Sequence, residues 1–148
     1  MKRKNILTVV LGIGNRLRGD DGAGSIIADL VKNKNKSLIS IDSGTTPENH
    51  IGKIVKINPD RVILIDTANF NGKPGEYKII KEEDIDYRGF STHTLPISMI
   101  VEQLKLAGIK DISLIGIQPE NTTFGHSISC TVDKAITEIS TDILKGNI

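Results

Sequence analysis

The fold of this chain is set by residues 9–24, VVLGIGNRLRGDDGAG. The stretch begins as an apolar strand, breaks into a glycine-rich turn and delivers two adjacent carboxylates, Asp20 and Asp21, at the start of a helix. Glycine adopts backbone conformations that other residues avoid and lets other groups approach closely, so this turn can follow a tight path. What the two carboxylates do is the question that the rest of the sequence has to answer.

Apolar runs and helical periodicities alternate along the rest of the chain. Strands are predicted at 6–11, 38–41, 62–65, 76–80 and 112–117. Helical spacing of apolar residues follows at 26–31, 51–55, 97–104 and 132–143. The link between the third and fourth strands is too short for a helix, so the fourth is expected to run antiparallel to the third. This order predicts an α/β fold, a three-layer α/β/α sandwich with a mostly parallel five-stranded sheet and one antiparallel strand.

Composition excludes several classes of function. The chain has 148 residues, which predicts one domain, and its net charge of +1 gives no broad field for nucleic acid or an anionic membrane. Aromatic residues make up only 3%, which argues against a base-stacking surface. No apolar run reaches the roughly 18 residues of a membrane span. A single cysteine excludes an internal disulfide, and we expect a cytoplasmic protein that is not embedded in a membrane.

The glycine turn does not match a nucleotide site. Leu17 stands where the dinucleotide fingerprint needs its third glycine. Gly14 and Gly19 have the spacing of a phosphate loop, but Asp20 and Asp21 replace the lysine and hydroxyl that contact phosphate and magnesium. Two carboxylates at that place would repel a phosphate group, so no nucleotide cofactor is expected. The alternatives for the acidic pair are helix capping and a functional site, and residue chemistry alone favours neither.

Two polar residues downstream bear on that choice. Asp66 follows a run of aliphatic residues and stands at the C-terminal end of the third strand, where ligands collect in sheets of this kind. A carboxylate there is expected to face Asp21 across a crevice. His93 precedes the third long helix. Two carboxylates and an imidazole from three loops would form an open site suited to a divalent metal such as nickel or zinc.

Each of these residues also has a simpler interpretation. Asp66 could only turn the chain, and His93 alone is more typical of a solvated or capping histidine. His50 has no acidic partner at metal-ligand spacing, whereas His126 lies in the last loop and could join the rim of the site. Cys130 is expected to be a small buried residue.

Several motifs together resemble those of the hydrogenase maturation proteases, the endopeptidases that trim the large subunit of NiFe hydrogenases. The likeness covers nearly the whole chain in the right order, so we expect residues 1–148 to form a single domain of this type. It is greatest for the branch that acts on hydrogenase-3-type enzymes. The motifs are Gly12-Ile13-Gly14-Asn15, Asp20-Asp21-Gly22-Ala23-Gly24, Asp42-Ser43-Gly44, Pro47-Glu48-Asn49, Ile65-Asp66-Thr67-Ala68, Pro74-Gly75-Glu76, Thr92-His93 and Leu114-Ile115-Gly116-Ile117-Gln118-Pro119.

The resemblance implies a reaction and a set of site residues. The family's metal-binding acid, strand-end aspartate and histidine correspond to Asp21, Asp66 and His93, which we therefore expect to be both the metal ligands and the catalytic residues. The metal implied is the nickel of the substrate, and the partner is the large-subunit precursor, whose C-terminal extension is removed after nickel insertion. A metal-bound water or a carboxylate base, Asp20 or Asp21, could drive hydrolysis.

Two other functions would use the same three residues. One is a nickel-sensing accessory protein that escorts the large subunit without cutting it. The other is a small-molecule metallohydrolase, which would be active without a protein partner.

Overall fold

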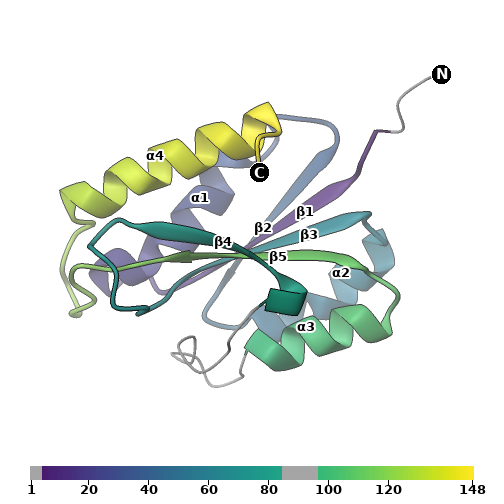
Figure 1. The fold of residues 1–148 in the computed structure, drawn as a ribbon, viewed down its shortest axis with the longest axis horizontal. Helices are drawn as coiled ribbons and strands as arrows, with labels where there is room; N and C mark the ends of the chain where they lie inside the picture. Colours follow the sequence, from purple (N-terminus) through teal and green to yellow (C-terminus); the bar gives the residue numbers. More distant parts are fainter. Residues whose placement is uncertain (1–4, 85–96) are drawn as a thin grey trace.

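The protein forms a five-stranded sheet with helices on both faces (Figure 1). The structure is a computed structural model that describes residues 5–84 and 97–148. Its strands are β1 (Thr8–Ile13), β2 (Leu38–Gly44), β3 (Arg61–Thr67), β4 (Tyr77–Lys81) and β5 (Asp111–Ile117). Its α-helices are α1 (Ala23–Val31), α2 (Ile51–Ile57), α3 (Ile97–Leu106) and α4 (Cys130–Lys145). The described residues also include the short 3-10 helices η1 (Gly19–Gly22), η2 (Pro47–His50) and η3 (Glu82–Asp84).

The strands lie in the order β2-β1-β3-β5-β4, and all are parallel except β4. The predicted fold class is therefore confirmed. β4 runs opposite to β3, as the short link predicts, but its partner is β5, which lies between the two. The burial pattern explains this order: every residue of β5 from Ile112 to Ile117 is buried, whereas β4 is half exposed and suits an edge.

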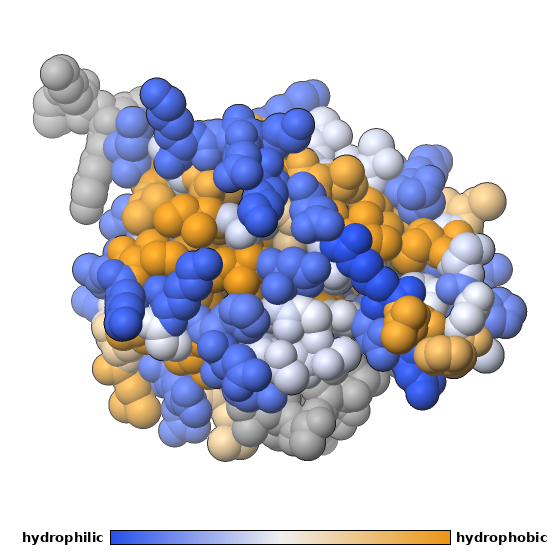
Figure 2. All heavy atoms as spheres, turned by 180° about the vertical axis from the view of Figure 1, so that it is seen from behind, coloured by the Kyte–Doolittle hydropathy of each residue, from blue (hydrophilic) through white to orange (hydrophobic). Residues whose placement is uncertain are grey.

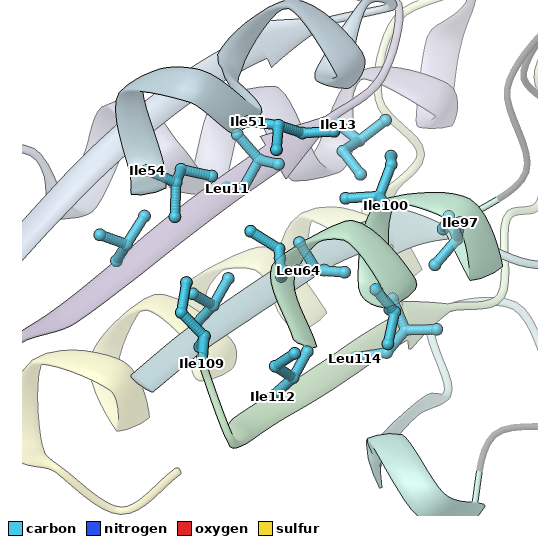
Figure 3. Close-up of a cluster of buried hydrophobic side chains, with 14 of the residues drawn as sticks. Leu11, Ile13, Ile51, Ile54, Leu64, Ile97, Ile100, Ile109, Ile112 and Leu114 are labelled. Atoms are coloured by element: carbon cyan, nitrogen blue, oxygen red, sulfur yellow. The ribbon is translucent and has the colours of Figure 1, made fainter. Parts of the chain in front are cut away.

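Alternate residues of the strands supply two apolar cores. On one face, residues such as Leu11 and Leu64 pack against α2 and α3 (Figure 3). On the other face, residues such as Val10 and Ile63 pack against α1 and α4. This alternation follows from the two-residue repeat of a strand, and both cores are almost entirely aliphatic.

The register places the predicted site at one edge of the sheet. Gly12 of β1 pairs with Asp42 of β2 and with Ile65 of β3. The chain segments that follow these strands therefore leave the sheet side by side, and Asp66 comes directly after Ile65. The prediction that the glycine turn, Asp42 and Asp66 share one edge is confirmed.

Polar side chains cover most of the side that faces away in Figure 1, and apolar atoms reach the surface between them (Figure 2). No helix in the described part of the chain is long and apolar enough to cross a membrane.

Candidate functional site

The start of α1 is pressed directly onto the ends of β1 and β3. A Cβ atom on Gly24 would lie 2.4 Å from the carbonyl oxygens of both Ile13 and Ile65, and one on Gly12 would lie 2.2 Å from the carbonyl oxygen of Gly24. Side chains cannot occupy such positions, so these glycines are needed for the close approach of backbone to backbone. The glycine-rich turn therefore fixes η1, with its two carboxylates, against the edge of the sheet.

Asp21 is held by the turn and by the end of β3. Its Oδ2 accepts a hydrogen bond from the backbone N–H of Asn15 at 3.1 Å, and its Oδ1 accepts one from the Thr67 hydroxyl at 2.9 Å. Its side chain is mostly buried, with 8% of the residue exposed. Because Thr67 directly follows Asp66, this bond joins the two segments that carry the predicted acids.

Asp66 lies at the end of β3, as predicted, and is fully buried. Its Oδ1 accepts a hydrogen bond from the backbone N–H of Thr67 at 2.8 Å. Because side chains alternate along a strand, Asp66 points to the face of the sheet that Leu64 occupies, whereas Thr67 points to the face of Ile65.

An open cleft of about 660 Å³ lies above this edge of the sheet. Three segments line it: Arg18 and Asp21 from the turn, residues 67–69 at and after the end of β3, and residues 118–120 with Thr122 after β5. A ligand at the C-terminal ends of the strands is the usual arrangement in α/β sheets. Among the predicted site residues that the structure describes, Asp21 lies on the wall of this cleft and Asp66 does not.

Asp20 has a different environment from its neighbour. Its carboxylate is fully buried and accepts hydrogen bonds from the backbone N–H groups of Glu120, Asn121 and Ser129 and from the Ser129 hydroxyl, at 2.7–3.0 Å. Burial alone would raise the pKa of the Asp20 carboxyl, but these hydrogen bonds from Ser129, Asn121 and Glu120 outweigh it and hold the pKa below its ordinary value. Asp20 is thus an ionised anchor for the segment after β5.

Asp20 and Asp21 lie in the first turn of η1, where acids are favoured, but the N-cap residues are Arg18 for η1 and Gly22 for α1. In the described structure the hydrogen bonds to both carboxylates come from Asn15, Thr67 and the segment after β5, so side-chain capping does not account for the acidic pair.

Sequence reasoning missed two residues that shape the site, Thr67 and Gln118. The side chain of Gln118 lines the cleft, accepts hydrogen bonds from the N–H groups of Phe70 and Gly72, and donates one to Asn69. It thereby holds the loop between β3 and β4. Their positions in the sequence could have indicated this role, because both residues lie at the C-terminal ends of predicted strands, where ligands bind in sheets of this kind.

The remaining predicted residues have separate outcomes. His93 lies outside the described residues. Among the described residues, no group of three His, Cys, Asp or Glu side chains could hold a metal ion. His50 ends η2, and His126 lies in the loop after β5, where its Nδ1 is 3.1 Å from Nδ2 of Asn121; neither lines the cleft. Cys130 is exposed, so the expectation of a buried residue is wrong; as the first residue of α4 it lies off the helix's apolar stripe.

The fold and the cleft define an α/β protein with an open cleft at the carboxyl edge of a mostly parallel sheet. The family model described as hydrogenase maturation protease, HycI, matches residues 26–146. The hydrogenase 3 maturation protease of Escherichia coli K12 is 33% identical over 130 residues, which are 86% of this chain and 83% of that protein.

Two solved structures are similar over almost the whole chain. The endopeptidase HycI from Escherichia coli has a TM-score of 0.86 at 29% identity and covers 97% of this chain and 92% of its own. The NiFe hydrogenase maturation protease HycI from Thermococcus kodakarensis KOD1 has a TM-score of 0.81 at 31% identity, with 93% and 90% covered. This chain therefore belongs to the hydrogenase maturation protease family, and it is an endopeptidase.

Proposed function

We propose that this endopeptidase removes the C-terminal extension from the large-subunit precursor of a NiFe hydrogenase after nickel has been inserted. The names of the matching family and of the Escherichia coli relative support a hydrogenase precursor as the substrate. The single cysteine, which excludes an internal disulfide, supports the cytoplasm as the place of the reaction.

The observation that carries the proposal is the hydrogen bond between Thr67 Oγ1 and Asp21 Oδ1 beside an open cleft. It brings the acid of the glycine turn next to the segment that carries Asp66. Asp21, Asp66 and His93 would offer two carboxylates and an imidazole to nickel that the precursor already holds, a donor set that suits a first-row divalent ion. An incomplete site of this kind binds free nickel weakly and gains affinity only when the precursor supplies the other ligands.

In this proposal nickel is part of the substrate and acts as the recognition element. A precursor without nickel lacks the anchor that places its C-terminal segment in the cleft, so it is not cut. The peptide bond is then hydrolysed beside the nickel, and Asp21, on the wall of the cleft, is the carboxylate that we propose to act there.

The test is to incubate the protein with nickel-loaded and nickel-free precursor and to measure the mass of the large subunit. We expect the C-terminal peptide to be lost only from the loaded form. Equal cleavage of both forms would contradict nickel recognition. A stable complex with an unchanged mass would instead support the non-cleaving accessory protein, and hydrolysis of small substrates alone would support the metallohydrolase.

Substitutions test the three residues one at a time. Asp21→Asn, Asp66→Asn and His93→Ala should each slow processing of loaded precursor by about 100-fold or more, the range for groups that act directly in catalysis. Asp111→Asn is the matched control, because Asp111 begins β5 at the opposite end of the strand from the cleft. A variant that processes precursor at the wild-type rate would remove its residue from the site.

A further inference from the structure

Asp20 clamps the segment after β5 from both of its ends. Its Oδ2 accepts hydrogen bonds from the N–H groups of Glu120 at 2.8 Å and Asn121 at 3.0 Å, and from the Ser129 hydroxyl at 2.7 Å. Its Oδ1 accepts the N–H of Ser129 at 2.8 Å. In the other direction, the backbone N–H of Asp20 donates to the carbonyl of Asn121 at 2.9 Å. One buried carboxylate thus fixes both the beginning of this segment and the residue before α4.

The clamped segment is one wall of the cleft. Glu120, whose N–H binds Asp20, lines the cleft together with Gln118, Pro119 and Thr122. A second backbone bond, from the N–H of Gly125 to the carbonyl of Leu17 at 2.8 Å, ties the same segment to the glycine turn. The position of this wall relative to η1 therefore depends on a small set of hydrogen bonds, and most of them end on Asp20.

Asp21 does not depend on this clamp. Its hydrogen-bond partners are Asn15 in the turn and Thr67 at the end of β3, and neither belongs to the segment after β5. Loss of the Asp20 carboxylate would move the wall and leave Asp21 in place. The two neighbouring acids therefore have separate roles: Asp20 holds the wall after β5, and Asp21 is held independently beside the cleft.

We infer that Asp20 is a positioning residue, which holds the wall formed by residues 118–122 at the distance from Asp21 that the precursor needs to bind. The inference rests on the proposed function, because it concerns how that substrate is bound. A residue that only positions the wall affects how the precursor binds and not the hydrolysis step. We therefore expect its loss to raise KM and to leave kcat unchanged.

Two variants test the inference with nickel-loaded precursor. Asp20→Asn keeps the shape of the side chain but replaces an acceptor oxygen with an amide that faces donors. Ser129→Ala removes one donor to Asp20 and leaves the helix start intact, since Ser129 makes no side-chain capping bond to α4. Asp111→Asn is the matched control, because this partly buried aspartate begins β5 at the end of the strand opposite the cleft, where it pairs with Lys81.

We expect Asp20→Asn to raise KM about tenfold or more, since small misplacements of substrate-positioning groups have effects of that size. Ser129→Ala should raise KM less, because only one of the four donors is lost, and the control should not change it. In both variants kcat should stay within about twofold of wild type. A purely structural role predicts the opposite pattern, because partial unfolding lowers the amount of active enzyme and leaves KM unchanged.

Amide hydrogen exchange gives a readout that needs no substrate. In Asp20→Asn the amides of Glu120, Asn121 and Ser129 should exchange faster than in wild type, while the amide of Asn15, bound to Asp21, should not. Unchanged exchange at residues 120, 121 and 129, or a fall in kcat at constant KM, would overturn the inference. If the wild-type enzyme leaves loaded precursor uncut, the proposed function fails, and the exchange experiment still decides whether the clamp exists.

Discussion

Gly24→Ala is the sharpest test of how the turn places the site. Intrinsic helix propensity predicts a gain of about 1 kcal/mol for alanine over glycine inside α1. The structure predicts a loss, because the new Cβ would meet the carbonyl oxygens of Ile13 and Ile65 at 2.4 Å. These are backbone atoms of two strands, which cannot rotate away as a side chain could.

The expected size follows from these two opposed effects. Overpacking of a rigid interior typically costs about 1–3 kcal/mol, and the upper end applies to backbone neighbours. After the propensity gain of about 1 kcal/mol, Gly24→Ala should lower the free energy of unfolding by about 2 kcal/mol. For a chain of this length that corresponds to a Tm about 4–8 °C lower.

Gly52→Ala provides the matched control. Gly52 also lies in a helix, α2, but a Cβ there would have no atom within 4 Å. Only the propensity term remains, so this variant should be more stable than wild type by about 0.5–1 kcal/mol. Urea unfolding followed by far-UV circular dichroism measures all three proteins. If Gly24→Ala were as stable as Gly52→Ala, the argument that glycine is needed for close packing of η1 and α1 on the sheet would be refuted.

Substitutions at three further residues probe a hydrogen bond, a buried hydroxyl and a tyrosine with a raised pKa. Thr67→Val removes the hydroxyl bonded to Asp21 and should destabilise the protein by about 1.5–3 kcal/mol in urea unfolding, whereas Thr67→Ser, which keeps the hydroxyl, should lose less. Ser113→Ala should be neutral or more stable by about 1 kcal/mol, because the buried Ser113 hydroxyl has no partner among the described residues. Burial, with Glu138 and Asp142 on α4, raises the pKa of Tyr77 above 10.0. The folded state therefore favours neutral Tyr77, and stability that is present below pH 10.0 is lost as the pH rises through the raised pKa. The Tyr77→Phe variant should not show this loss of stability at high pH. Urea unfolding at a series of pH values would measure the difference, and an equal fall in the free energy of unfolding of both proteins above pH 10.0 would contradict the prediction.

Most of the fold could be predicted because it depends on local patterns. Continuous aliphatic runs indicated the parallel strands, and helical spacing indicated the helices between them. The neighbour of β4 could not be obtained in the same way. A short link fixes the direction of the next strand, but the pairing partner depends on long-range contacts, here the pair of backbone bonds that join Gly75 and Glu76 to Gln118. The half-exposed pattern of β4 against the buried pattern of β5 was the signal that could have indicated which strand lies at the edge.

The candidate site was predictable in position and less so in detail. Topology places the ends of β1 and β3 side by side, so Asp21 and Asp66 were expected at one edge, and the register of the sheet bears this out. The contact between Thr67 and Asp21 could not be foreseen, because it depends on side-chain geometry between residues far apart in the sequence. Cys130 was misjudged for a different reason: cysteine is usually buried, but this one begins a helix on its exposed side.

The different environments of Asp20 and Asp21 could not be predicted from the sequence. Two adjacent acids in a turn have the same chemistry, and both favour a helix start. In a tight 3-10 turn, however, consecutive side chains point in different directions, so each meets a different part of the protein. Asp21 meets the end of β3 beside the cleft, and Asp20 meets a segment about a hundred residues further along the chain. A buried carboxylate that accepts four hydrogen bonds has no acceptor capacity to spare for a metal or a substrate, whereas Asp21, with one donor on each oxygen and an open cleft beside it, retains some. The hydrogen-bond environment therefore supports the inferred anchoring role of Asp20 and the proposal that Asp21 is the acid that meets the precursor.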